Sequence, residues 1–264
     1  DLCAFRPAYK GGLEMKVNQA RSAGFCFGVK RAISLALSTA RGNRNVCMLG
    51  DIVHNEHVVS QIEQAGIKKI SRLGKGKNKI LLIRAHGASQ RLINQAKERG
   101  YTIKDATCPM VKEIHSIARR MEKKCGTIIV IGDKEHDEVL GIIGQLKSKA
   151  IVIDLPEHIP FKQLTRIRKA CVVVQSTQNS DNVEKIYGLL KTVIKNIRLY
   201  NTICNPTRAK QAEIRTMPLE NDVMIVIGSR SSANTRRLYE ISKSLNRRTY
   251  WVNSRKEIDP GWFI

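Results

Sequence analysis

The sequence predicts an α/β protein made of three pseudo-equivalent α/β units, whose small and mostly parallel sheets surround a common centre. Its 264 residues, 42% of them hydrophobic and 26% charged, are enough to bury sizeable cores and exclude disorder as the main state. Short apolar segments of strand length alternate with amphipathic segments of helix length, a pattern typical of parallel sheets. A threefold internal repeat sets the number of units.

Two markers define the repeat. The first is a cysteine that follows an extended segment and precedes the start of a helical pattern, and it occurs at Cys26, Cys108 and Cys204. The second is a glycine that ends an apolar strand, and it occurs at Gly50, Gly132 and Gly228. Both markers are separated by 82 and then 96 residues, and each glycine comes 24 residues after its cysteine. This regularity indicates three related units of about 90 residues.

Each unit is expected to contain the same elements in the same order. One amphipathic helix joins the cysteine to the glycine, at residues 29–40, 111–123 and 207–217. A polar loop and a second helix follow, at 54–66, 134–146 and 231–245. A short strand comes next, at 67–70, 151–154 and 248–252. An apolar strand, a third helix and a final strand complete units one and two, at 79–87, 90–100, 101–106, 169–178, 182–196 and 197–203.

The repeat also predicts the boundaries of the units. Residues 1–14 form an N-terminal extension, and the units span 15–107, 108–203 and 204–264. The strand-like segment 15–20 has no earlier unit to join, so we expect it to close the sheet of unit three. The loop of unit three that matches His86 and Ser176 would fall near 264–272, but the sequence stops at Ile264. Unit three is therefore expected to be incomplete at its C-terminal end.

Charge and cysteine content narrow the class of protein. The net charge of +23 favours polyanionic partners, but only 5% of residues are aromatic, so stacking platforms for bases are scarce. No apolar run has the length of a membrane span or a signal peptide, which predicts a cytoplasmic protein with no membrane partner. The seven cysteines are then not expected to form disulfides, and Cys47, Cys125 and Cys171 are interpreted as small core residues.

Cys26, Cys108 and Cys204 are expected to meet at the centre, because functional groups of parallel sheets gather where strand ends meet helix starts. Three thiolates suit zinc or an iron–sulfur cluster. A cubane cluster with three cysteine ligands leaves one iron without a protein thiolate, and that iron is free to bind a substrate oxygen. Zinc is less well motivated since no ligand pair has zinc-finger spacing, and three structural cysteines remain an alternative. We therefore interpret the centre as a cluster site.

The loops after the repeat glycines are candidates for an anion site. Each opens a helix whose free N–H groups and dipole favour phosphate. The candidate binding side chains are His54, His86, His136, Ser232 and Asn234. The other histidines, His57, His115 and His158, are interpreted as structural.

Glu138, two residues after His136, is the acidic group best placed to deliver a proton inside such a cavity. Burial would keep its carboxyl protonated, and the hydroxyls of Ser176 and Thr177 are candidates for a relay. Helices in general also prefer a glutamate in the first turn, so position alone leaves both readings open. The remaining acidic residues near these loops, Asp51, Asp133, Asp137 and Glu56, are interpreted as caps or surface charges.

In the order and spacing of its motifs, the chain resembles the 4-hydroxy-3-methylbut-2-enyl diphosphate reductases, the last enzymes of the non-mevalonate isoprenoid pathway. The motifs are GFCFGVKRA, HNEHVV, RAHGASQ, DATCPMVKEIH, GDKEHDEV, QSTQ, NTICNPT and SSANTRRL. The resemblance implies a three-lobed α/β protein with a central 4Fe-4S cluster on Cys26, Cys108 and Cys204. It also implies diphosphate contacts from His54, His86, His136, Ser232 and Asn234, a proton from Glu138 and a hydroxyl relay through Ser176.

The reaction implied by the resemblance removes the allylic hydroxyl with two electrons and two protons, and gives isopentenyl and dimethylallyl diphosphate. The implied electron donor is ferredoxin or flavodoxin. Because both are acidic, the positive charge of the chain would also attract the donor. The chain departs from the family at Ser176, usually threonine, at Ala233, usually serine, and in a C-terminal Gly-Ala-Ser loop that the sequence does not reach. These departures predict weak substrate binding. They leave a basic RNA-binding protein and a zinc-stabilised scaffold as alternatives.

Overall fold

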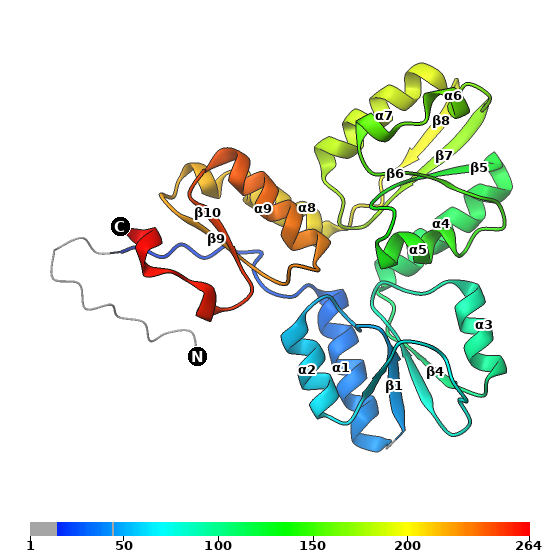
Figure 1. The fold of residues 1–264 in the computed structure, drawn as a ribbon. Coiled ribbons are helices and arrows are strands. Elements are labelled where there is room, and N and C mark those ends of the chain that lie inside the picture. Colours follow the sequence, from blue (N-terminus) through cyan, green and yellow to red (C-terminus); the bar gives the residue numbers. More distant parts are fainter. Residues whose placement is uncertain (1–14, 44) are drawn as a thin grey trace.

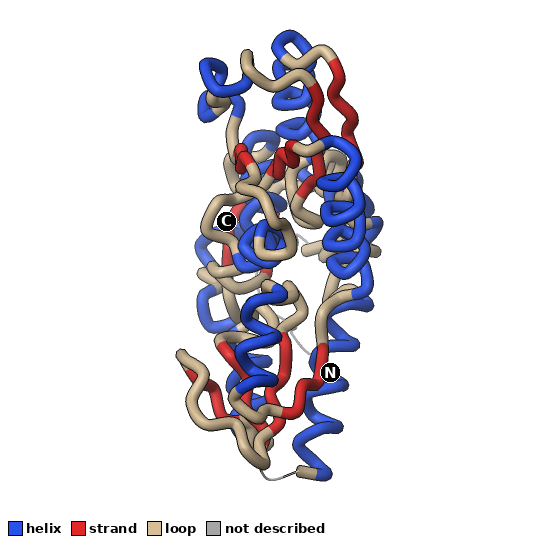
Figure 2. The backbone as a smooth tube through the Cα atoms, turned by 90° about the vertical axis from the view of Figure 1, so that its right-hand side faces the viewer, coloured by secondary structure: helices blue, strands red, loops and turns tan. Residues whose placement is uncertain are grey.

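The computed structural model describes residues 15–43 and 45–264, and the expected extension 1–14 lies outside this range. Within these residues the strands form three separate sheets, one in each of three lobes (Figure 1). Every strand pair in them is parallel, so the predicted fold class is confirmed. The lobes spread mainly within the plane of Figure 1, and Figure 2 shows the narrower side of the molecule.

Unit one has a four-stranded sheet in the order β2-β1-β3-β4. Its elements are α1 (Phe27–Gly42), β1 (Val46–Leu49), α2 (Glu56–Gln64), β2 (Lys68–Ile70), β3 (Ile80–Ile83), α3 (Gln90–Glu98) and β4 (Thr102–Asp105). The two faces of the sheet bury alternate strand residues. Met48 and Leu82 pack in the core cluster that includes α1 and α2, whereas Cys47 and Leu81 pack in the cluster that includes residues of α3. This two-sided burial explains the continuous apolar runs of the strands.

Unit two repeats this arrangement with the order β6-β5-β7-β8. Its elements are α4 (Pro109–Cys125), β5 (Thr127–Ile131), α5 (Asp137–Ile143), β6 (Ile151–Ile153), the 3-10 turn Pro156–His158, α6 (Phe161–Leu164), β7 (Lys169–Val174), α7 (Ser180–Val193) and β8 (Asn196–Tyr200). Ile129 and Ile131 of β5 pack in the cluster that includes α7, and Ile128 and Val130 pack in the cluster that includes α4 and α5. Because strand side chains alternate in direction, both faces are buried.

Unit three contains half as many strands in the described residues, where β9 pairs only with β10. Its elements are α8 (Asn205–Glu213), the 3-10 turn Met217–Leu219, β9 (Met224–Ile227), α9 (Ala233–Leu245), β10 (Thr249–Val252) and the 3-10 turns Arg255–Glu257 and Pro260–Phe263. Ile227, at the end of β9, is 67% exposed. The pairing of β9 with β10 nevertheless corresponds to that of β5 with the edge strand β6: Ile227, just before Gly228, lies opposite Val252, as Ile131, just before Gly132, lies opposite Ile153.

The prediction that segment 15–20 forms a strand is wrong, because the structure assigns it no strand. Val17 is 79% exposed, and the segment is held by side chains instead of a ladder of backbone hydrogen bonds. Asn18 Nδ2 donates to Asn221 Oδ1 at 2.7 Å, and Ser22 N donates to the Glu213 carboxylate at 2.9 Å. The N-terminal segment therefore runs alongside unit three without joining its sheet (Figure 1).

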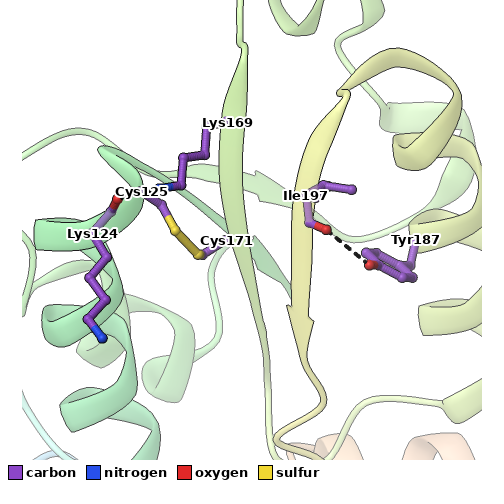
Figure 3. Close-up of a disulfide and its surroundings, with 6 residues drawn as sticks. All are labelled: Lys124, Cys125, Lys169, Cys171, Tyr187 and Ile197. Carbon is purple, nitrogen blue, oxygen red and sulfur yellow. Dashed lines mark hydrogen bonds between the residues drawn. A yellow bond between two sulfur atoms is a disulfide. The ribbon is translucent and has the colours of Figure 1, made fainter.

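The prediction that the cysteines form no disulfide is also wrong. Cys125 at the end of α4 is joined to Cys171 in β7 (Figure 3). Helix α4 packs on the sheet that contains β7, and this brings the two Cα atoms to 6.0 Å, a normal separation for a disulfide. Cys47, in contrast, is a free and buried core residue as predicted.

No helix in the part of the chain that the structure describes is long and apolar enough to cross a membrane.

Candidate functional site

Three cysteines begin three helices, one from each unit. Cys26, Cys108 and Cys204 are the N-cap residues of α1, α4 and α8. Two of them are also bound to the loop that follows a central strand. Cys108 N donates to Ala85 O at 2.9 Å after β3, and Cys204 N donates to Ser176 O at 3.1 Å after β7. The backbone thus places Cys108 and Cys204 beside the residues that the sequence singled out in the preceding loop.

The cysteine sulfur atoms lie near one another. A Cβ atom on Gly28 would be 2.5 Å from Cys108 Sγ and 3.9 Å from Cys26 Sγ, so only glycine leaves room for both at this position. Burial raises the pKa of Cys108 and of Cys204, and nearby thiols add to both effects. A separate group of possible metal ligands in the described residues is formed by one ligand atom each of His54, His86 and Asp137, which all lie within 4.8 Å of one another.

Three histidines from two units form a cluster. The ring centroids of His54 and His86 are 4.1 Å apart, and the ring centroid of His136 lies 5.2 Å from that of His54 and 5.5 Å from that of His86. Two buried ring nitrogens, His54 Nε2 and His86 Nδ1, have no hydrogen-bond partner in the structure. The sequence expected three imidazoles here, and the structure brings all three together.

Burial keeps these imidazoles neutral. It lowers the pKa of His54, lowers that of His86 well below its ordinary value, and lowers that of His136 to about 4. His136 is also the N-cap of α5, where its Nδ1 accepts a hydrogen bond from Glu138 N at 3.1 Å. Because Nδ1 accepts, the proton of the neutral ring is on Nε2, which is then available to donate to an anion.

Glu138 and Ser176 form a buried pair. Glu138 is 1% exposed, and its two carboxylate oxygens accept hydrogen bonds from Ser176 N at 2.6 Å and Ser176 Oγ at 2.7 Å. Burial raises the pKa of Glu138, although both bonds from Ser176 and the nearby Arg237 oppose the effect. The Glu138 carboxyl therefore keeps its proton to a higher pH than an ordinary glutamate does, a property that suits a proton donor.

Unit three contributes the start of α9. Ser232 is the N-cap, and its Oγ accepts from Thr235 N at 3.2 Å. Asn234 is half-buried in the first turn, and Ala233 is buried. Helix α9 begins with free backbone N–H groups that favour an anion. Ala233 contributes only a methyl group, which packs inside and offers no hydrogen bond.

Sequence reasoning missed the contacts that join the units. Asp133 and Asp137 are not caps: they accept hydrogen bonds from Arg237 at 2.7 Å and from Arg84 at 2.6 Å. Glu56 accepts a hydrogen bond from Ser229 Oγ at 2.6 Å, which joins unit one to unit three. The three acidic residues occur where the loop after a repeat glycine faces a neighbouring unit. Only Asp51 remains a local charge, paired with Lys69 at 2.5 Å.

The histidines interpreted as structural lie away from the imidazole cluster or have another role. His57 is exposed on α2, and half-exposed His158 bonds to Asp154 at 2.8 Å. His115 is buried on α4, and burial lowers its pKa to about 4. Its ring fills space left by Gly87 and Gly141, where added Cβ atoms would lie 2.7 Å and 3.4 Å from it.

Comparison with known proteins identifies the family of this site. A family model described as LytB protein matches residues 17–264. The chain belongs to the LytB family. A relative from Trichlorobacter lovleyi, named 4-hydroxy-3-methylbut-2-enyl diphosphate reductase, is 37% identical over 94% of this chain and 88% of its own length. A second, from Aquifex aeolicus and with the same name, is 35% identical over 92% of this chain and 85% of its length.

Solved structures of LytB reductases share the fold. One, described as the terminal enzyme of the non-mevalonate pathway, has a TM-score of 0.70 and 35% identity, and the match covers 92% of this chain and 88% of that one. The reductase from Plasmodium falciparum has a TM-score of 0.82 and 28% identity, covering 90% and 76%. The alternative of an RNA-binding protein finds no support among these matches.

Proposed function

We propose that this chain is a 4-hydroxy-3-methylbut-2-enyl diphosphate reductase. It would remove the allylic hydroxyl of its substrate as water, using two electrons and two protons, and release isopentenyl or dimethylallyl diphosphate. The observation that carries the proposal is the meeting of three neutral imidazoles with a buried glutamate–serine pair, in a chain of the LytB family. The reaction needs an anion site that holds the diphosphate group and a protonated carboxyl that can protonate the departing allylic hydroxyl.

Cys26, Cys108 and Cys204 would hold a 4Fe-4S cluster. Three thiols at three helix starts, with the space beside Gly28 filled by the Cys108 and Cys26 sulfurs, fit such a group. A single zinc ion would need its thiolates about 3.8 Å apart, from Zn–S bonds of about 2.3 Å. Zinc is also less well motivated because no pair of these cysteines has zinc-finger spacing. When bound, the cluster supplies the electrons and one iron that lacks a protein thiolate.

The diphosphate would be bound by His54, His86, His136, Ser232 and Asn234. A neutral imidazole can donate one hydrogen bond to an anion, and the proton on His136 Nε2 is already in place for this. The start of α9 adds backbone N–H groups. Ala233 removes one hydroxyl from this set, which costs about 1.5–3 kcal/mol of binding for a lost hydrogen bond to a charged group unless water replaces it.

Glu138 would deliver a proton to the departing oxygen. The Ser176 Oγ atom, 2.7 Å from its carboxylate, would orient the acid and extend its reach towards the substrate. Ser176 keeps the hydroxyl of the threonine that the family usually has, so this part of the site is chemically intact. Electrons must come from outside the chain, and ferredoxin or flavodoxin, both acidic, would match its charge of +23.

Anaerobic purification followed by turnover tests the proposal. The iron-loaded protein should be brown and should convert 4-hydroxy-3-methylbut-2-enyl diphosphate into both products with reduced methyl viologen as donor. Cys108→Ala should remove the colour and the iron. Glu138→Gln should keep the visible spectrum and substrate binding but lower kcat at least about 100-fold.

Two outcomes would contradict the proposal. Colourless protein with one zinc ion per chain would indicate the scaffold alternative. Iron-loaded protein without turnover, but with steeply salt-dependent RNA affinity that diphosphate does not reduce, would indicate the RNA-binding alternative.

A further inference from the structure

Arg237 is a buried arginine whose guanidinium joins two units. It lies on α9 of unit three and is 5% exposed. Its Nη2 donates to Asp133 Oδ1 at 2.7 Å, its Nε donates to Gln178 Oε1 at 2.9 Å, and its Nη1 donates to Ala233 O at 3.2 Å. All three nitrogens of one planar group are therefore used, each on a different segment of the chain.

The segments that Arg237 contacts are those that carry the site. Asp133 follows Gly132 and precedes His136 and Glu138 in the same loop. Gln178 follows Ser176 by two residues, and its backbone oxygen accepts from Gln211 on α8 at 2.9 Å. Ala233 lies between Ser232 and Asn234 at the start of α9. One side chain thus connects both loops of unit two with the helix start of unit three.

Arg236 provides a natural contrast. It donates to the other oxygen of the same carboxylate, Asp133 Oδ2, at 2.9 Å. Its side chain is 48% exposed, whereas that of Arg237 is 6% exposed. Exposed ion pairs contribute little, whereas a buried arginine that makes three directed hydrogen bonds defines the position of its partners.

We propose that Arg237 is a positioning residue, which sets Ser232 and Asn234 of unit three at a fixed place relative to His136, Glu138 and Ser176 of unit two. The inference rests on the proposed function, because the distance between these groups matters where one diphosphate must touch both units. Without Arg237, α9 would remain helical, but its position relative to the loops of unit two would no longer be fixed. Substrate binding would suffer more than the chemistry that follows it.

The test compares Arg237→Gln with the matched control Arg236→Gln in the iron-loaded protein. Arg237→Gln should raise KM for the diphosphate substrate at least about tenfold, with a smaller change in kcat and an unchanged visible spectrum and iron content. Arg236→Gln should change KM less than about twofold. Hydrogen–deuterium exchange should rise in residues 133–138 and 175–180 only in the first variant. A wild-type KM in Arg237→Gln, or equal effects of the two substitutions, would overturn the proposal.

Asp133→Asn keeps the test decisive if Arg237→Gln does not fold, and it should raise KM in the same way. Where both single variants fold, their effects should not multiply in the double variant, because both remove one interaction. Independent effects would refute the pairing. If the wild-type protein shows no turnover, the proposed function fails; calorimetry with inorganic diphosphate then tests positioning alone, and equal affinity for wild type and Asp133→Asn would refute it.

Discussion

At the scale of single residues, the site is built from polar groups that the fold has taken out of water. Glu138 is 1% exposed, and His86 is half-buried with its Nδ1 atom out of solvent, so burial moves the pKa of the carboxyl up and that of the imidazole down. Both shifts favour the uncharged form.

The raised pKa of Glu138 predicts a pH-dependent gain in stability for Glu138→Gln. Below about pH 4.5, the ordinary pKa of the group, native and unfolded chains both bind the proton and the two proteins should be equally stable. As pH rises through the native pKa, unfolding releases this proton, so the wild-type protein loses stability whereas the variant does not. At pH 8 the variant should be more stable by on the order of 1 kcal/mol.

Urea denaturation at pH 4.5 and pH 8 measures this difference. Ser176→Ala is a useful control, since it removes the Oγ bond without removing the carboxyl. A Glu138→Gln variant that is less stable than wild type at pH 8 would mean that the carboxylate is ionised and satisfied in the native state.

How far these residues were predictable depends on their chemistry. Cysteine, histidine and a glutamate at strand ends are few and stand out, so the main candidates were found and the structure groups the histidines and Glu138 with Ser176. Arg237 and Gln178 were not found. Arginine is one of the commonest residues in this basic chain, and nothing in the local sequence shows that one copy is buried and its neighbour Arg236 exposed.

At the scale of elements, the candidate site residues repeatedly occur at the N-termini of helices. Cys26, Cys108 and Cys204 cap α1, α4 and α8, while His136 and Ser232 cap α5 and α9. The sequence predicted these helices closely, because their amphipathic period and first-turn prolines are local signals. It failed for segment 15–20, where strand formation depends on a partner edge and not on the segment's own residues.

Gly28 on α1 leaves the space in which the sulfur atoms of Cys26 and Cys108 approach each other. Gly28→Ala should displace Cys108 Sγ, since the added Cβ would lie 2.5 Å from it. The anaerobically purified variant should therefore contain less than about half the iron of wild type and show a weaker visible spectrum. Gly42→Ala, at the other end of the same helix with open space around it, is the matched control and should bind iron normally. Full iron content in Gly28→Ala would show that the two cysteines do not share one bound group.

At the scale of the whole molecule, three lobes are held by a few polar contacts around a common centre (Figure 1). Glu56–Ser229, Arg84–Asp137 and Asp133–Arg237 each join a different pair of units. Each contact involves the loop after a repeat glycine, so the loops that carry the candidate ligands also set the position of the lobes. Small movements between lobes would then change the site directly.

The charge of +23 predicts how the protein receives electrons. With saturating substrate, kcat/KM for reduced flavodoxin should fall at least about tenfold between about 0.1 M and about 1 M salt, because the screening length drops from about 10 Å to about 3 Å. Turnover with reduced methyl viologen should change less than about twofold and serves as the control. Equal salt sensitivity with both donors would show that the charge does not guide the donor protein.

The order of residues was enough to define the repeat, the parallel α/β class and the candidate residues for the chemistry. These features depend on local periodicity, on rare side chains at strand ends and on the spacing of those residues along the chain, all of which are visible in the sequence. The disulfide, the incomplete pairing of β9 and the role of Arg237 became visible only once the chain was folded. They depend on which distant segments come into contact and on which of many identical charges is removed from water, and neither property belongs to a segment alone.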